Sequence, residues 1–328
     1  MNQSPWYAKA GDVVFSSRVR LARNVAGYAF PARLPQAEKA KLQARVTQAA
    51  KDAMPDLVVT DMQTISAAEA FAMAARWEIS RGFAAQQTGV LLSDQNKTVG
   101  IMVCEEDHIR LQTLEAGLDL PKVFDRANKI DDAIAARLPY AFDAQLGYLT
   151  QCPTNLGTAM RASVLLHLPA LASLDRVALL GETFATLGYT IRGAFGEGTE
   201  AQGALFQLSN QVTLGMDEQT VIADLQAHTL QIIEKERRAA AQCLRQPKIK
   251  DQIWRAFGIL SAARLLEHNE AVQLLSLVRM GAARGILPVP LERVNALIPG
   301  IQPASIALLP DGTDAEKRAN LVRGALGT

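Results

Sequence analysis

The stretch "CPTNLGTAMRASVLLHLPAL" (residues 152–171) combines a Cys-Pro pair, a turn with a glycine, and an apolar run that one arginine interrupts. Successive side chains of a strand point to opposite faces, which divides the run into an apolar face of Ala162, Val164, Leu166 and Leu168 and a mixed face of Arg161, Ser163, Leu165 and His167. We therefore predict a strand over 159–168 that is anchored by its apolar face and carries Arg161 at its mouth, beside the turn at 154–157.

Amphipathic segments and short apolar runs surround this strand. Apolar residues spaced by three and four, together with many alanines, predict helices at 36–53, 66–80, 121–137 and 173–187. Short apolar runs predict strands at 13–23, 89–93, 98–103, 108–112 and 203–209. Polar turns such as 94–97 are typical of an antiparallel meander.

The character of the chain changes at about Met216, after which the pattern is helical. Helices are predicted at 217–245, 249–267, 269–282 and 314–325, with breaker-rich segments at 284–290 and 297–303. We expect an α+β fold, in which an antiparallel sheet flanked by helices is followed by an all-helical C-terminal domain. The expected domains are residues 1–215 and 216–328.

The composition is ordinary for a globular protein. The 328 residues include 49% hydrophobic and 20% charged residues with a net charge of +1, which gives no bulk attraction to nucleic acid or membranes. Cys104, Cys152 and Cys243 are too few and too far apart for a disulfide framework or a close-spaced zinc site. Without a targeting segment or a long apolar span, a cytoplasmic location is expected.

Segment 13–23, "VVFSSRVRLAR", places Ser16, Arg18 and Arg20 on one face if it is extended. Adjacent guanidinium groups repel each other unless an anion lies between them, and a polyphosphate suits the fork of arginine. The alternative interpretation of this segment alone is a solvated edge strand.

Segment 104–110, "CEEDHIR", ends one strand with acidic residues and begins the next with an arginine. Alternation places Glu106, His108 and Arg110 on a common side unless a tight turn intervenes. A solvated hairpin tip is the alternative.

Residues 191–210, "IRGAFGEGTEAQGALFQLSN", contain closely spaced glycines around Arg192 and Glu197. Such a loop lets a ligand approach the backbone, although it matches neither a Walker loop nor a dinucleotide fingerprint; a flexible surface loop is the alternative. Cys152 is either an inert thiol or, beside arginines, a reactive thiolate. Four segments of the chain thus contribute five arginines, and together these indicate one anion-binding basin: Arg18, Arg20, Arg110, Arg161 and Arg192.

Taken in order, "SSRVRLAR", "EEDHIR", "CPTNLGTAMRAS" and "RGAFGEGTEAQGALFQLSNQVTLG" resemble the motifs of the ATP:guanidino phosphotransferases, the family of creatine and arginine kinases, over about residues 12–216. The chain is most similar to the bacterial protein arginine kinase subgroup, which phosphorylates arginine side chains in proteins and marks them for a Clp protease. About a dozen residues precede "FSSRVR", so we expect the N-terminal domain of the small-molecule kinases to be absent. The helical tail resembles the subgroup's dimerising domain, which reads phosphoarginine.

The resemblance implies a set of site residues. Arg18, Arg20, Arg110, Arg161 and Arg192 would hold the phosphates of ATP, which carries Mg²⁺, and no separate protein metal site is expected. The other implied nucleotide contacts are Ser16, Ser17, Val19, Trp77, Ala162, Ser163, Val164, Leu165, Gly193, Ala194, Phe195, Gly196 and Glu197. Glu106 and Glu197 would grip the acceptor guanidinium, and Cys152 matches the family's active-site cysteine.

The sequence departs from the subgroup's pattern at three places. Cys104 replaces an asparagine before the paired glutamates, and Trp77 stands where a histidine near the adenine is common. The phosphoarginine-sensing motif Arg-Asp-x-x-Arg-Ala aligns with 314–319, where only Arg318 and Ala319 remain.

The resemblance also implies partners: protein substrates with exposed arginines, a zinc-binding activator protein, a Clp ATPase or protease, and a second copy of the chain in a homodimer. Two alternative functions stay open at this point. One is a kinase for free arginine or another small guanidino compound, and the other is a catalytically weak adaptor that binds phosphoarginine.

Overall fold

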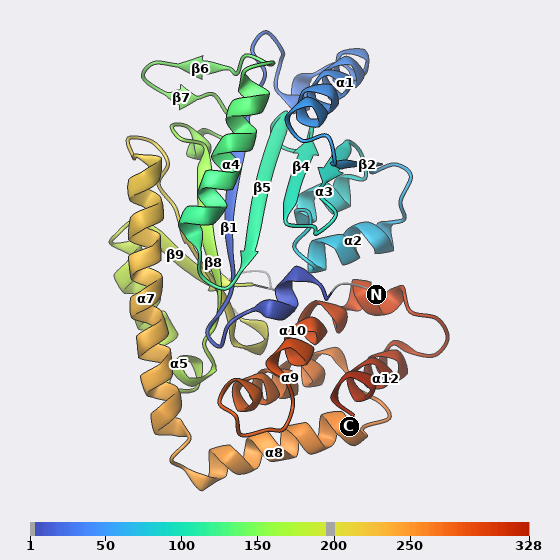
Figure 1. Cartoon of the computed structure of the whole chain (residues 1–328), viewed down its shortest axis with the longest axis vertical. Coiled ribbons are helices and arrows are strands. Elements are labelled where there is room, and N and C mark those ends of the chain that lie inside the picture. Colours follow the sequence, from blue (N-terminus) through green and yellow to red (C-terminus); the bar gives the residue numbers. More distant parts are fainter. Residues whose placement is uncertain (1–3, 195–200, 328) are drawn as a thin grey trace.

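The computed structural model describes residues 4–194 and 201–327. In these ranges one antiparallel sheet has the strand order β2-β3-β4-β5-β1-β8-β10-β9 (Figure 1). Its strands are β1 (Val14–Arg23), β2 (Val58–Asp61), β3 (Val90–Ser93), β4 (Val99–Val103), β5 (Ile109–Ala116), β8 (Met160–His167), β9 (Tyr189–Gly193) and β10 (Leu205–Asn210). A separate two-stranded ribbon pairs β6 (Phe142–Asp143) with β7 (Gly147–Tyr148).

The helices of the sheet-containing part are α1 (Gln36–Ala53), α2 (Ala67–Ala75), α3 (Arg81–Gln86), α4 (Leu120–Ala135), α5 (Pro169–Ser173), α6 (Val177–Ala185) and α7 (Glu218–Cys243). The helices that follow are α8 (Pro247–Ala262), α9 (His268–Ala283), α10 (Leu291–Gly300), α11 (Pro303–Ala307) and α12 (Asp314–Leu326). Short 3₁₀ helices occur at η1 (Trp6–Lys9), η2 (Pro31–Arg33), η3 (Pro153–Asn155) and η4 (Gln202–Ala204). None of the helices in the described ranges has both the length and the apolar character that a bilayer crossing requires.

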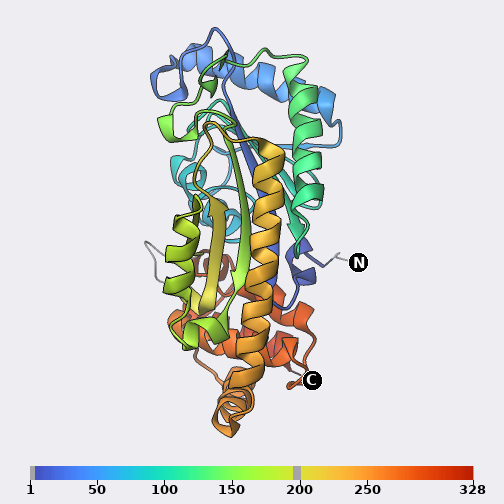
Figure 2. The ribbon, with the colours of Figure 1, turned by 90° about the vertical axis from the view of Figure 1, so that its left-hand side faces the viewer.

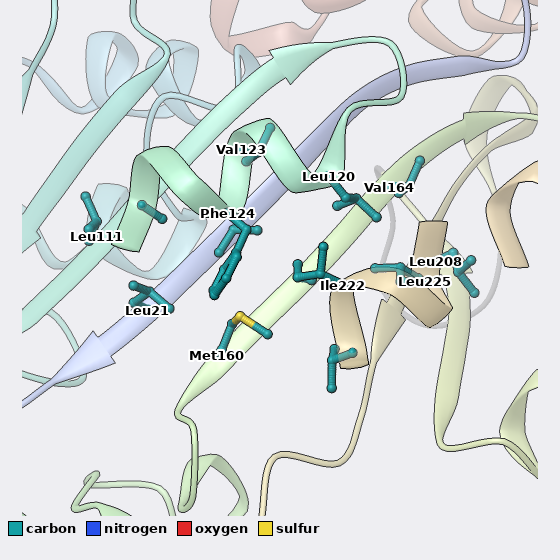
Figure 3. Packing of buried hydrophobic residues seen from close by; sticks show 14 of the residues in the cluster. Leu21, Leu111, Leu120, Val123, Phe124, Met160, Val164, Leu208, Ile222 and Leu225 are labelled. Carbon is teal, nitrogen blue, oxygen red and sulfur yellow. The ribbon is translucent and has the colours of Figure 1, made fainter. Parts of the chain in front are cut away.

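Strand β1 lies at the centre of the sheet, between β5 and β8. Helices α4 and α7 pack side by side across one face, over β1, β5, β8 and β10 (Figure 2). Their apolar side chains meet those of the strands in a continuous core, in which Phe124 of α4 and Ile222 of α7 lie among Leu21, Met160 and Leu208 (Figure 3). This packing leaves the opposite face of the central strands available for polar side chains.

Local capping sets the starts of both covering helices. The Asp119 side chain accepts a hydrogen bond from Lys122 N at the start of α4, at 3.2 Å, and Asp217 accepts one from Thr220 N at the start of α7, at 2.9 Å. Each cap satisfies one of the backbone N–H groups that a helix start leaves without an intrahelical partner. A buried ion pair, Arg23 with Asp131 at 2.8 Å, ties β1 to α4.

The side chains before and after the end of α7 belong mainly to two different hydrophobic cores. The first joins the sheet to α1, α4 and α7, and ends at Cys243. The second gathers side chains of α8–α10 and α12 together with Tyr7, Phe15 and Leu165. The boundary expected at residue 215 stays a prediction; by packing, α7 belongs with the sheet.

The expected α+β architecture is confirmed, with an antiparallel sheet followed by helices. The helix expected at 66–80 is too long: it ends at Ala75 because Trp77 has a left-handed φ of 61° and Ser80 caps a new helix, α3. The helix expected at 173–187 is shorter, since α6 begins only at Val177, after Asp175 with φ of 53°, and a separate short helix, α5, ends at Ser173. Strands β2 and β9 were not among the expected elements. Helix α10 begins just after the breaker-rich segment 284–290 and runs into the segment 297–303, at whose end α11 starts.

Candidate active site

Two adjoining cavities lie on the polar face of the sheet and share Arg20. The first, of about 410 Å³, is lined at one end by Ser16, Arg18 and Ser163 and at the other by mainly apolar side chains. The second, of about 520 Å³, is lined by Glu106, Arg110, Cys152, Arg161 and Arg192, among others. We call the two together the basin.

Strand register brings the basin's arginines together. Arg18 is paired with Ser163, and Arg20 lies directly opposite Arg161, across the β1–β8 pair. Like charges placed directly opposite each other on adjacent strands destabilise a sheet. The Nε atoms of Arg20 and Arg161 are also buried without a hydrogen-bond partner among the described residues. Such an arrangement is costly unless an anion binds there.

Polar neighbours hold two of these guanidinium groups in place. Arg18 Nη2 donates to Gln207 Oε1 at 2.7 Å, and its Nε donates to Ser163 Oγ at 3.3 Å. Arg161 Nη2 donates to Ser209 Oγ at 3.2 Å. Gln207 and Ser209 both come from β10, so three strands fix the orientation of the phosphate-facing side chains.

Burial, and after it the crowding of positive charge, lowers the pKa of three arginines. Burial, then repulsion from Arg161 and Arg110, lowers the pKa of Arg18 to about 10. Burial, then repulsion from Arg18, lowers the pKa of Arg20 well below its usual value, and burial followed by repulsion from Arg192 lowers that of Arg161. A guanidinium remains charged at neutral pH, so these shifts report electrostatic strain that a bound polyphosphate relieves.

The carboxylate of Glu106 lines the second cavity, and Glu105 precedes it in the chain. Arg110 forms ion pairs with Glu105 and with Glu106, the latter at 3.2 Å. Glu105 also accepts a hydrogen bond from Ser80 Oγ at 2.5 Å, which connects it to the start of α3. Glu105 is thus fixed in place, whereas the Glu106 side chain is 37% exposed and accessible to an acceptor group.

His108 shares no side with Glu106 and Arg110, because the condition for that expectation, the absence of a tight turn, is not met. A tight turn intervenes, in which Cys104 has φ of 59°. His108 is buried on the other side, where its Nδ1 accepts from Val25 N at 3.0 Å and its Nε2 contacts Ala29 O at 2.8 Å. His108 therefore shapes the turn that carries the glutamates and does not line the basin.

Cys152 lies half-buried at the edge of the second cavity, with its Sγ 3.0 Å from Thr154 Oγ1. The loop that carries it is fixed by Asp107, whose Oδ1 accepts from Gln151 N at 2.8 Å and from Asn24 Nδ2 at 2.7 Å. Asp107 belongs to the same turn as Glu106, so one carboxylate links the segments bearing Glu106 and Cys152. Sequence reasoning missed this connection because the segments are far apart in the chain.

The remaining sequence-predicted residues divide into three groups. Trp77, Leu165 and Ala194 line the first cavity, and Gly193 ends β9 next to Arg192. Phe195, Gly196 and Glu197 lie outside the described residues. The side chains of Ser17, Val19, Ala162 and Val164 are fully buried away from both cavities, which corrects the expectation that they line the site.

Strand alternation explains this correction. Val19, Ala162 and Val164 belong to the core beneath α4 and α7. Ser17 Oγ donates to Gly117 O at 2.9 Å and accepts from Asp119 N at 3.0 Å, so it supports the start of α4. Gln207, by contrast, was missed although period-two alternation along β10 places it on the same face as Ser209.

Arg318 of the altered 314–319 motif is buried in the C-terminal helices. Its Nε donates to Ile301 O at 3.1 Å and its Nη1 donates to Leu266 O at 2.8 Å, while Ala319 is packed in the second core. In this conformation the Arg318 guanidinium binds backbone carbonyl groups that join α12 to its neighbours.

Family comparisons agree with this arrangement of sheet, basin and helical tail. The model of the "ATP:guanido phosphotransferase, C-terminal catalytic domain" matches residues 39–239. The chain therefore belongs to the ATP:guanido phosphotransferase family. The model of the "Protein-arginine kinase McsB C-terminal domain" matches residues 246–327, which sets the chain in the protein-arginine kinase branch.

Similar proteins extend over nearly the whole chain. The protein-arginine kinase of Desulforamulus reducens is 40% identical over 345 residues, covering 99% of this chain and 96% of the relative. That of Brevibacillus brevis is also 40% identical, with the same coverage of 99% and 96%. A solved taurocyamine kinase from Schistosoma mansoni has a TM-score of 0.61 and 28% identity over 68% of this chain and 32% of its own. A solved lombricine kinase, at 23% identity, shows the fold alone, with a TM-score of 0.61 over 73% of this chain and 69% of its own.

Proposed function

We propose that this protein is a protein-arginine kinase that transfers the γ-phosphoryl group of ATP to arginine side chains of proteins. The observation that carries the proposal is the basin itself, in which opposed arginines of β1 and β8 lie beside Glu106 and Cys152. The arginines suit the phosphates of ATP, and the carboxylate and thiol suit the guanidinium of the acceptor.

The arginines would act mainly by positioning and charge stabilisation. Phosphoryl transfer spreads negative charge over the equatorial oxygens of the transferred group, and preorganised cations lower the energy of that state. We propose that Mg²⁺ enters with ATP as part of the substrate, held by phosphate oxygens and water. Glu106, which lines the basin, and its neighbour Glu105 are both paired with Arg110.

The acceptor guanidinium needs orientation and loss of a proton, because its pKa lies above about 12. Glu106 would bind the fork and accept the N–H proton as the nitrogen attacks the γ-phosphorus. The N–P bond forms as the bond between the γ-phosphorus and the bridging oxygen breaks, and ADP leaves with that electron pair. Glu197, beyond the described residues, is proposed as the second carboxylate, and Cys152 as a further contact to the guanidinium.

The wider role of the protein is also part of the proposal. It includes marking of substrates for Clp-type proteolysis, an activator protein, a homodimer and a cytoplasmic location. The support is the McsB-type C-terminal domain at residues 246–327 and full-length similarity to protein-arginine kinases. A regulatory role of Arg318 and Ala319 would require the Arg318 guanidinium to leave its two carbonyl partners.

Incubation with Mg²⁺–ATP and an unfolded model protein tests the proposal. Mass spectrometry under non-acidic conditions, which preserve the labile N–P bond, should find phosphorylated arginine, and Glu106→Gln should lower its rate of formation at least about a hundredfold. A parallel reaction with free arginine identifies a small-molecule guanidino kinase. Nucleotide binding without transfer to either acceptor would favour the adaptor alternative and contradict the proposal.

A further inference from the structure

The first cavity of the basin is also lined by mainly apolar side chains that the catalytic residues do not explain. One wall of the cavity is formed by Phe71, Ala74 and Ala75 of α2. The facing wall consists of Gln302, Pro303 and Ala304, at the start of α11. Helices α2 and α11 are in direct contact, although more than two hundred residues separate them in the chain.

We propose that the C-terminal helices form the roof of the subsite for the nucleotide base, and that Gln302 determines which base is accepted. The inference rests on the proposed function, since it takes ATP as the ligand. Arg18 and Arg20 line the same cavity, so a nucleotide whose phosphates contact them places its base toward the apolar end.

The chemistry of Gln302 fits this role. Its side chain is 8% exposed, lines the cavity and is positioned by a hydrogen bond from Nε2 to Ile298 O at 3.2 Å. An amide offers both a donor and an acceptor, and adenine presents an amino donor next to ring-nitrogen acceptors. Guanine reverses part of this pattern, so a fixed amide distinguishes the two bases.

The wall that carries Trp77 is tied to the same C-terminal helices by a second route. The ring centroids of Tyr7 and Phe15 lie 6.0 and 5.1 Å from that of Trp77. The segment around Tyr7 is held by α10, where Asn295 Nδ2 donates to Ala8 O at 3.0 Å and to Ala10 O at 2.9 Å. The C-terminal helices thus position two walls of the base subsite.

The contact between α11 and α2 couples the C-terminal helices to the affinity for ATP. If a ligand or partner of the C-terminal helices moves α11 relative to α2, it changes the affinity for ATP, and ATP changes the affinity for that ligand by the same factor. The roof therefore gives the C-terminal region a direct effect on nucleotide binding that needs no contact with the catalytic groups.

The test compares ligands with and without a base. Dissociation constants for ATP, GTP and inorganic tripolyphosphate are measured by calorimetry for the full-length wild type, Gln302→Ala and Ala304→Leu. Gln273→Ala, an exposed glutamine on α9, is the matched control. Thermal unfolding without ligand identifies any variant that fails to fold, and kcat and KM for ATP are measured with an unfolded protein substrate.

Gln302→Ala should weaken ATP binding about three- to tenfold, the effect of one lost hydrogen bond, and reduce the preference for ATP over GTP. Ala304→Leu should weaken the binding of both nucleotides by filling space, and KM for ATP should rise in both variants. Tripolyphosphate should bind all the proteins equally, because the arginines are unchanged. The proposed base subsite is overturned if folded Gln302→Ala and the wild type bind ATP with equal affinity. It is also overturned if the affinity for tripolyphosphate falls in parallel with that for ATP. A wild type that binds neither ATP nor tripolyphosphate overturns the proposed function as well.

Discussion

Replacement of Arg20 by methionine should have opposite effects on folding and on nucleotide binding. Methionine keeps much of the aliphatic stem and removes a charge that lies opposite Arg161 and whose Nε is buried without a partner among the described residues. Removal of the cross-strand repulsion contributes about 0.5–1 kcal/mol, and removal of an unsatisfied buried donor about 1–3 kcal/mol. Against these gains stands the lost attraction between Arg20 and Glu105. We expect the nucleotide-free variant to be about 1–3 kcal/mol more stable than the wild type.

Nucleotide binding should change in the other direction. A charge-assisted hydrogen bond to phosphate contributes about 1.5–3 kcal/mol, so Arg20→Met should weaken binding about ten- to hundredfold. A non-hydrolysable ATP analogue at about 100 times the wild-type Kd stabilises the wild type by about 2.7 kcal/mol. The variant, with its weaker affinity, gains much less at that concentration.

Urea unfolding followed by tryptophan fluorescence, with and without the analogue, measures both effects. Arg238→Met is the matched control, because Arg238 is exposed on α7 and its ion pair within the described residues is with Glu234 at 2.9 Å, a contact expected to change stability by less than about 0.5 kcal/mol. The reasoning is refuted if nucleotide-free Arg20→Met is less stable than the wild type, because Arg20 would then stabilise the sheet. Unchanged affinity for the analogue would likewise remove Arg20 from the phosphate site.

Three further changes test other parts of the molecule. Glu106→Gln should retain ATP affinity in calorimetry while kcat falls by at least about a hundredfold; turnover at the wild-type rate excludes Glu106 as the base. Asp131→Ala should lower the free energy of unfolding in urea by about 3–5 kcal/mol, because it leaves the Arg23 guanidinium buried without its 2.8 Å partner, and a loss below about 1 kcal/mol contradicts this role. Burial, and then repulsion from Arg279, lowers the pKa of His167 well below 6.5, so the stability that neutral His167 contributes is complete above about pH 6.5 and is lost as the pH falls towards its folded pKa. His167→Asn should reduce the slope of unfolding free energy against pH below 6.5 by up to about 1.36 kcal/mol per pH unit, and an unchanged slope shows that another group is responsible.

Local sequence patterns were sufficient for much of the scaffold. The helix expected at 36–53 is α1, with the same bounds, because its apolar spacing and alanine content are properties of neighbouring residues. Strand alternation also assigned Arg161, Ser163 and His167 correctly to the face opposite the core. Backbone conformation at single positions was harder to predict, since a left-handed φ at Trp77 and Cys104 changes the direction of the chain without a glycine to indicate it.

The sequence by itself determined which arginines share a face of their own strand and which motifs the chain carries. Only the tertiary structure decided that Arg20 lies opposite Arg161, that Asp107 joins the Glu106 turn to the Cys152 loop, and that Gln302 reaches the cavity of Arg18. The physical reason is the range of the forces involved. Periodicity and capping act between residues a few positions apart, whereas strand register and helix packing join segments whose separation in the chain carries no local signal.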